Sequence, residues 1–162
     1  MTDPLDRLLV TLAEPGQPDT LFRAFDEACQ DLVGHKLFTL LIVDGQEVAR
    51  VYSSRPAEYP VSGRKLMGPT PWGAHVIQAR KPYLGRDVAG IRWAFFDAPL
   101  IESMGLGSSV NIPTVYDGAT IGTINLLNAE FHYDEIHVAP LTRLAPLLVP
   151  AFLAARFAAR GS

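Results

Sequence analysis

Runs of apolar and β-branched residues occur in two places along the chain, and a polar Asp-Gly pair divides each of them. Residues 108–116 and 119–127 flank Asp117-Gly118, and residues 36–43 and 46–53 flank Asp44-Gly45. Asp-Gly favours a two-residue hairpin turn, because a type I′ turn needs positive φ at both central positions. The pattern predicts two antiparallel hairpins that together build one sheet.

The second hairpin, 108–127, is apolar on both of its faces, which is typical of central strands covered on both sides. A regular two-residue turn places Pro113 opposite Gly122, which leaves room beside the proline ring. The same register puts Asn111 and Asn125 on opposite faces. We therefore expect at most one of these two asparagines to face a pocket.

Helical spacing of apolar residues predicts three longer helices. Leucines recur over residues 4–13 until a Pro- and Gly-containing stretch ends the pattern, and Asp19 is a suitable N-cap for a helix over 20–32. Asp134 caps a C-terminal helix over 134–158. That helix contains Pro140, Pro146 and Pro150, each of which removes a helical hydrogen bond, so we expect kinks or a break.

The segment that joins the hairpins, residues 54–104, begins Pro- and Gly-rich and then becomes more regular. Thr70-Pro71 predicts the start of a short helix to residue 79, residues 81–85 fit an edge strand, and residues 97–104 fit another short helix. The order predicts an α+β domain with a mostly antiparallel sheet of five or six strands and helices on both faces. We expect a single domain over 1–162 with its core at about 19–153.

Composition and charge narrow the classes of partner. The 162 residues are 48% hydrophobic with a net charge of -3, which indicates a globular domain without the basic surface of a nucleic-acid binder. The N-terminus lacks the basic and apolar regions of a signal peptide, and residues 141–155 are too short and interrupted for a membrane span. We expect a cytoplasmic protein that contacts neither nucleic acid nor membrane.

Three sequence segments in the second half of the chain resemble the sequence hallmark of GAF domains. They are Ser109-Val110-Asn111-Ile112-Pro113, then Asp117-Gly118, and then Ile121-Gly122-Thr123-Ile124-Asn125-Leu126. Residues 130–135 are similar to the segment that leads into the last helix of GAF domains. The resemblance covers about residues 20–153. It implies a profilin- or PAS-like sheet, a pocket between that sheet and the crossover helices, and a role in small-molecule sensing or dimerisation.

The crossover also contains a cluster of aromatic and basic residues that suits a ligand pocket. An arginine binds a carboxylate through two hydrogen bonds, and planar rings exclude water around a small molecule. The alternative is that the tryptophans are core residues and that Asp87 or Asp97 pairs with the arginine. The residues that we predict to contact a ligand are Trp72, His75, Arg92, Trp93, Asn111 and Tyr52.

No motif in the sequence predicts catalysis, a metal or a cofactor. His132 and His137 are five residues apart, so they do not share a helix face as metal ligands would. One GAF branch resembles a free-methionine-sulfoxide reductase that needs paired cysteines, whereas Cys29 is the only cysteine of this chain. The leading hypothesis is a non-catalytic domain that binds a small anionic or aromatic metabolite. The alternative is an association module that forms a homodimer through helices 5–12 and 141–158.

Overall fold

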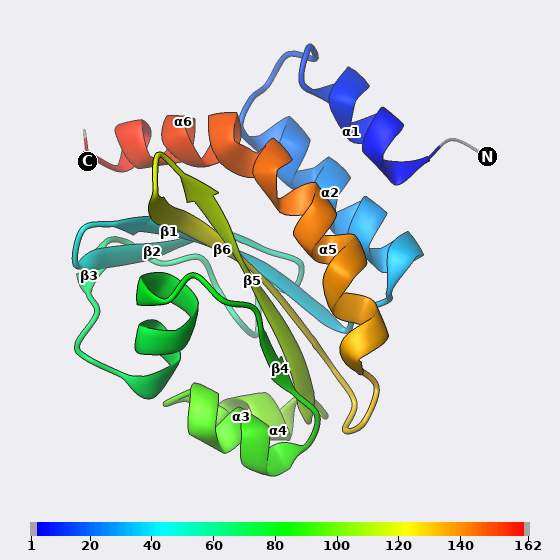
Figure 1. Ribbon diagram of the computed structural model, residues 1–162, viewed down its shortest axis with the longest axis vertical. Coiled ribbons are helices and arrows are strands. Elements are labelled where there is room, and N and C mark those ends of the chain that lie inside the picture. Colours follow the sequence, from blue (N-terminus) through cyan, green and yellow to red (C-terminus); the bar gives the residue numbers. More distant parts are fainter. Residues whose placement is uncertain (1–2, 161–162) are drawn as a thin grey trace.

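The described part of the chain, residues 3–160 of the computed structural model, contains one six-stranded antiparallel sheet (Figure 1). The strand order is β3-β2-β1-β6-β5-β4. The central strands are the two predicted hairpins, and the short β3 and β4 lie at the edges. The bounds are β1 Leu37–Asp44, β2 Glu47–Ser53, β3 Lys65–Leu66, β4 Tyr83–Gly85, β5 Ser108–Tyr116 and β6 Ala119–Asn128. The prediction of an α+β fold with a sheet of five or six strands is confirmed.

The β1–β2 turn differs by one residue from the prediction. Asp44 pairs with Glu47, so the turn consists of Gly45 and Gln46, and Gly45 has the positive φ of 63°. Asp44 is therefore the last residue of β1 rather than a turn residue. Its carboxylate accepts hydrogen bonds from arginine side chains that lie elsewhere in the sequence.

The β5–β6 hairpin turns at Asp117-Gly118 as predicted, but its register is not regular. The pairing shifts between Thr114 and Val115, which leaves Ile121 as the extra residue of a β-bulge. Beyond the bulge every partner moves by one position, so Asn111 pairs directly with Asn125. The expectation that these asparagines lie on opposite faces was wrong, because one extra residue turns all later side chains to the other face.

Helices cover both faces of the sheet (Figure 1). One face carries the terminal helices, and the other carries the short helices of the crossover. The terminal group comprises α1 Pro4–Thr11, α2 Asp19–Leu32, the 3₁₀ turn η2 Glu135–His137, α5 Val138–Leu144, the 3₁₀ turn η3 Ala145–Leu148 and α6 Val149–Arg160. The crossover group comprises the π-helix η1 Gly73–Gln78, α3 Val88–Ala94 and α4 Ala98–Ser103.

The larger core lies under the terminal helices. Phe152 of α6 packs directly on Gly122, where a Cβ would come within 2.5 Å of the ring, so this glycine makes room for the helix rather than for Pro113. The predicted break in the C-terminal helix is confirmed, because the 3₁₀ turn η3 separates α5 from α6. The helical stretch Glu135–Arg160 is long and apolar enough to span a membrane, but Leu141 and Leu148 are fully buried against the sheet.

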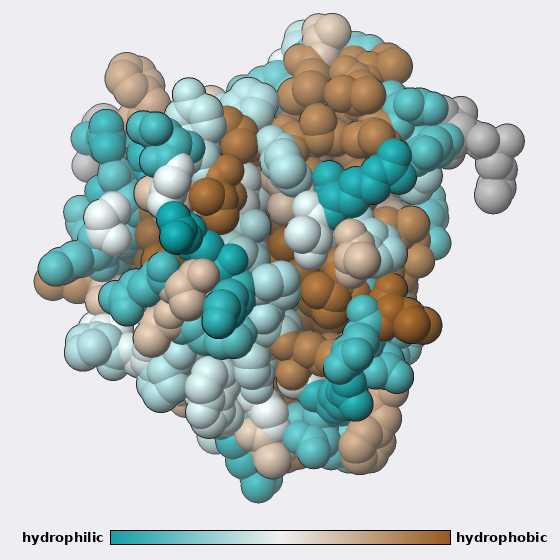
Figure 2. Space-filling view, in the orientation of Figure 1, coloured by the Kyte–Doolittle hydropathy of each residue, from teal (hydrophilic) through white to brown (hydrophobic). Residues whose placement is uncertain are grey.

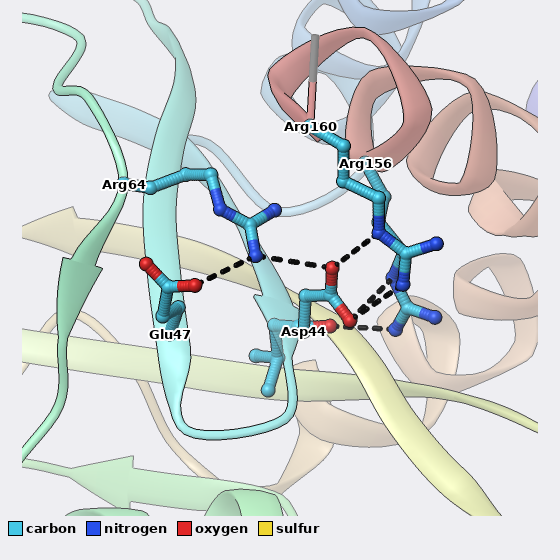
Figure 3. A network of polar contacts seen from close by, with 6 residues as sticks. Asp44, Glu47, Arg64, Arg156 and Arg160 are labelled. Carbon is cyan, nitrogen blue, oxygen red and sulfur yellow. Dashed lines mark hydrogen bonds and ion pairs between the residues drawn. The ribbon is translucent and has the colours of Figure 1, made fainter. Parts of the chain in front are cut away.

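The end of α6 is tied to the sheet by an ion-pair cluster that we call the Asp44 cluster (Figure 3). The Asp44 carboxylate accepts from Arg64 at 3.1 Å and from Arg160 at 2.8 and 2.9 Å, and it lies 3.8 Å from Arg156. Arg64 also donates to Glu47 at 3.0 Å. One carboxylate at the end of β1 thus joins α6 to the crossover segment that leads into β3.

Candidate functional site

A cavity of about 360 Å³ lies between the sheet and the beginning of the crossover. Its floor consists of side chains from β1, β2 and β6, and its other walls come from the segment 65–72 and the link between α3 and α4. The volume is within the range of small-molecule sites. The lining residues are Thr39, Leu41, Val48, Arg50, Tyr59, Lys65, Leu66, Met67, Gly68, Thr70, Trp72, Ala94, Phe95, Phe96, Asp97, Asn125 and Leu127.

Arg50 supplies the fixed positive charge of this cavity. Strand alternation in β2 places it on the same face as Val48, and its guanidinium carbon lies 3.9 Å from the centroid of the Tyr59 ring. One guanidinium N–H donates to the Pro60 carbonyl at 2.8 Å. Arg50 forms no ion pair with any carboxylate of residues 3–160, so its charge is available to a ligand.

Tyr59 connects Arg50 to an acidic residue of the cavity wall. Its hydroxyl donates to Asp97 Oδ2 at 2.8 Å. Burial raises the pKa of Tyr59 well above its usual value, so the phenol stays neutral and remains a donor. The ring therefore holds a cation on its face and a carboxylate at its hydroxyl.

A polar stripe crosses the floor of the cavity. Asn125 donates to the Thr39 hydroxyl at 3.3 Å, and its carbonyl accepts from Asn111 at 2.8 Å and from Thr123 at 3.1 Å. Asn125 and Thr39 line the cavity, whereas Asn111 lies behind Asn125 and reaches the cavity only through it. Both asparagines lie on the cavity face of the sheet. The expectation that only one of them could face a pocket therefore no longer applies.

Trp72, one of the residues predicted to contact a ligand, lines the cavity. It precedes the π-helix η1, whose first backbone N–H, that of Gly73, is capped by the Thr70 hydroxyl at 2.9 Å. The indole is only 6% exposed, and its N–H has no acceptor among the described residues. A π-helix is a rare conformation that is frequently found at functional sites.

Arg92, the predicted anion ligand, lies outside the cavity. Its side chain is 68% exposed on α3 and donates to Glu102 of α4 at 2.9 Å. The partner is thus Glu102 and not Asp87 or Asp97. Adjacent residues of a helix point about 100° apart, so Arg92 faces solvent although the preceding Ile91 is buried.

His75 and Trp93 form an aromatic group outside the cavity lining. Trp93 stacks on Tyr83 with ring centroids 5.0 Å apart, and His75 meets the edge of the same tyrosine. His75 Nε2 also lies 2.8 Å from the Pro82 carbonyl oxygen. These contacts explain both residues as supports of the β4 edge.

Tyr52 lies on the opposite face of the sheet, under α2. Its hydroxyl donates to Asp26 at 2.6 Å, and the same carboxylate lies 2.8 Å from His35. The irregular β1–β2 register near Leu40 accompanies this orientation. Tyr52 therefore fastens α2 to the sheet.

Cys29 is a residue of α2 and lies in the core on the face of the sheet that the terminal helices cover. It is fully buried, and burial raises the pKa of its thiol far above the usual value. The thiol is thus on the other side of the sheet from the cavity. Within residues 3–160, no three His, Cys, Asp or Glu side chains gather as metal ligands would.

Comparison with known proteins identifies the family. The model of the GAF domain matches residues 17–152, which is most of the chain. The chain belongs to the GAF domain family. GAF domains are sensory and regulatory modules, and the resemblance seen in the sequence is confirmed. No curated protein that was compared with this GAF domain matches it.

Solved structures show the same fold at low sequence identity. The GAF domain of a phosphoenolpyruvate-protein phosphotransferase from Coxiella burnetii has a TM-score of 0.76 and 19% identity, with 94% of this chain and 92% of that chain covered. The GAF domain of a two-component sensor histidine kinase from Bacillus halodurans has a TM-score of 0.70 and 11% identity, with 87% and 97% covered. A far-red absorbing protein in its dark state, with biliverdin bound, has a TM-score of 0.65 and 16% identity, with 94% and 99% covered.

Proposed function

We propose that this GAF domain binds a small anionic metabolite with an aromatic or planar body, reversibly and without chemistry. The observation that carries the proposal is the unpaired guanidinium of Arg50, held against Tyr59 inside a cavity of about 360 Å³. A planar cation with free donors recognises carboxylates and other oxyanions through paired hydrogen bonds.

A second cation of the cavity lining agrees with an anionic ligand. Lys65 lies with its ammonium 5.6 Å from the Phe96 ring centroid and, among residues 3–160, it also has no ion-pair partner. Asp97 is the acidic residue of the lining: Tyr59 donates to its Oδ2, and its buried Oδ1 has no hydrogen-bond partner among the described residues. Trp72, Phe95 and the largely exposed Phe96 supply apolar surface for a ring.

Thermal unfolding with a panel of aromatic carboxylates tests the proposal, because a ligand that binds only the native state raises the melting temperature. We expect at least one aromatic carboxylate to raise the melting temperature of the wild type. Arg50→Gln should abolish the shift. Arg92→Gln is the matched control, since that arginine lies outside the cavity, and it should keep the shift. A panel without any shift, or a shift that survives Arg50→Gln, would contradict the proposal.

A second candidate is association of two copies through the terminal helices. Figure 2 shows apolar residues gathered over the side of the molecule that α1, α5 and α6 form. Val10 of α1 is 67% exposed and Phe157 of α6 is 78% exposed. Exposed apolar patches mark interaction sites more often than chance surface.

Light scattering separates this candidate from the first. Association through these helices predicts a dimer that Val10→Asp or Phe157→Asp converts to a monomer. Ligand binding at Arg50 predicts a thermal shift that is unaffected by these two substitutions. A wild type that is monomeric at all accessible concentrations would remove the association candidate.

A further inference from the structure

Asp97 is the acidic residue of the cavity lining, and one of its two carboxylate oxygens lacks a partner. Oδ2 accepts from the Tyr59 hydroxyl at 2.8 Å, whereas Oδ1 is buried and accepts no hydrogen bond within residues 3–160. Asp97 precedes α4, but its side chain accepts no hydrogen bond from the first turn of that helix. The described part of the fold therefore gives this oxygen no donor.

No cation of the described residues neutralises Asp97 either. The cations of the lining are Arg50 and Lys65, and neither forms an ion pair with it. The Trp72 N–H is the other buried polar atom of the lining without a partner, and it does not donate to Oδ1. A carboxylate withdrawn from water is costly unless a positive charge or N–H donors accompany it, so a group that brings both would be bound favourably.

Tyr59 sets the spacing between Asp97 and the cation of the proposed anion site. The Arg50 guanidinium carbon lies 3.9 Å from the centroid of the Tyr59 ring, and Asp97 accepts from the hydroxyl of the same residue. The cation and the carboxylate thus lie at the face and at the tip of one side chain, and they form no ion pair with each other. A ligand that meets both must carry its own anionic and cationic groups close together.

A plain anion would use only part of this site. It would pair with Arg50, but it would also bring a negative charge towards the unpaired oxygen of Asp97, and like charges repel each other most where water is excluded. An ammonium beside the anionic group offsets that repulsion. It also supplies N–H donors, which a carboxylate accepts in charge-assisted hydrogen bonds.

Building on the proposed function, we infer that the ligand is a zwitterion of the α-amino-acid type with an aromatic side chain. Its carboxylate pairs with Arg50, and its ammonium donates to Asp97. Its ring lies against the apolar surface that Trp72 and Phe95 provide. Asp97 is the residue that selects amino-bearing ligands over plain carboxylates, and Tyr59 positions both charged residues.

Calorimetric titration with three probes tests this inference. The probes share a phenylethyl body: L-phenylalanine carries both charged groups, 3-phenylpropanoate lacks the ammonium, and 2-phenylethylamine lacks the carboxylate. We expect the wild type to bind phenylalanine at least about tenfold more tightly than either of the other two, because a site that pairs with a polar group rejects the analogue that lacks it.

Asp97→Asn should remove the preference for the amino group. The asparagine oxygen can still accept from Tyr59, but the negative charge is lost, so phenylalanine should bind about tenfold more weakly and 3-phenylpropanoate at least as tightly as before. Asp97→Ser is a second, shorter replacement, and circular dichroism verifies the fold of each variant. Asp87→Asn is the matched control. Asp87 caps α3 by accepting from the Gly90 N–H outside the cavity lining, so the ratio of the affinities should not change.

Arg50→Gln tests the other charged group of the ligand. It should weaken phenylalanine and 3-phenylpropanoate by a similar factor, because both present a carboxylate to this residue. The affinity for 2-phenylethylamine should stay the same or rise, since that probe has no carboxylate and is repelled by the guanidinium.

The outcomes separate this inference from the proposed function. Phenylalanine that binds no more tightly than 3-phenylpropanoate, or that fails to bind a protein that binds other aromatic carboxylates, would overturn the zwitterion and leave anion binding at Arg50 intact. A preference for phenylalanine that survives both Asp97→Asn and Asp97→Ser would overturn the role of Asp97. Failure of all three probes, in a wild type that also ignores every other aromatic carboxylate, would overturn the proposed function itself.

Discussion

The guanidinium carbon of Arg50 lies 3.9 Å from the centroid of the Tyr59 ring. A cation on an aromatic face is stabilised by about 0.5–2 kcal/mol, depending on how far water is excluded. The stacking also fixes the plane of the guanidinium before any ligand arrives. Less conformational entropy would then be lost on binding, so the anion site that we propose is preorganised.

Tyr59→Leu should therefore weaken binding of an aromatic carboxylate by about tenfold, because Arg50 loses both its support and its preferred orientation. Calorimetric titration measures the change. Tyr59→Phe is the control, since it keeps the ring and loses only the hydrogen bond to Asp97, and it should retain most of the affinity. Equal losses of affinity in the two variants would show that the hydroxyl of Tyr59, and not its ring, supports binding.

Gly122→Ala should destabilise the domain by about 3 kcal/mol in urea unfolding, because overpacking displaces well-packed groups. An added methyl group would lie 2.5 Å from the Phe152 ring and 2.8 Å from the Leu41 carbonyl oxygen. Gly63→Ala is the matched control. No atom lies within 4 Å of a Cβ built there, so its free energy of unfolding should change by less than about 0.5 kcal/mol. Similar losses at the two positions would contradict the packing of α6 on β6.

The Asp44 cluster predicts a loss of stability in acid. Hydrogen bonds from Arg160 and Arg64 lower the pKa of Asp44 from the ordinary 3.8 to about 2. Because the folded state has the lower pKa, the stabilisation is complete above about pH 4 and is lost as the pH falls from about 4 to 2. Partial solvent exposure of the arginines limits the effect to about 1–2 kcal/mol.

Urea unfolding of the wild type and of Asp44→Asn across this pH range measures the effect. The variant should be less stable at neutral pH, and the difference between the two proteins should shrink in acid. Glu135→Gln is the control, because Glu135 pairs with Arg86 at an exposed site far from α6. A difference between wild type and Asp44→Asn that stays constant with pH would contradict the lowered pKa.

Cys29 should be inert towards thiol reagents in the native protein. Burial and the raised pKa both keep the thiolate population negligible, so Ellman's reagent should react only after denaturant is added. Cys29→Ser should lower the free energy of unfolding by about 1–3 kcal/mol, because burying a hydroxyl in this apolar core costs more than burying a thiol. Rapid modification of the folded protein would place the thiol at an accessible site and contradict its burial.

The sheet was predictable from the sequence because its signals are local. Asp117-Gly118 adopts the positive φ values that a type I′ turn needs, and the strands follow from the residues that flank it. The register was not predictable, because the bulge at Ile121 depends on packing across the sheet. Consequently the predicted positions of Asn111 and Asn125 relative to each other were wrong, although both were recognised as polar residues of central strands.

The residue types of the cavity lining were predictable, but not which residues supply them. An arginine with aromatic neighbours was expected, and Arg92 next to Trp93 satisfied that pattern in sequence. In the structure the arginine of the cavity is Arg50, whose aromatic neighbour Tyr59 follows after a reversal of the chain. The available signal was a single cation on the inner side of an otherwise apolar strand. Alternation alone could not indicate which side of β2 would face the crossover.

The shared carboxylate of Asp44 has one more consequence. Arg64 leads directly into Lys65 and Leu66 at the rim of the cavity, while Arg160 belongs to the last turn of α6. A molecule that drew Arg64 away would leave the carboxylate to the helix alone, and a partner that captured Arg160 would free it for the rim. If a ligand at the rim displaced Arg64, its binding and the attachment of α6 would be linked, and that linkage would have equal size in both directions.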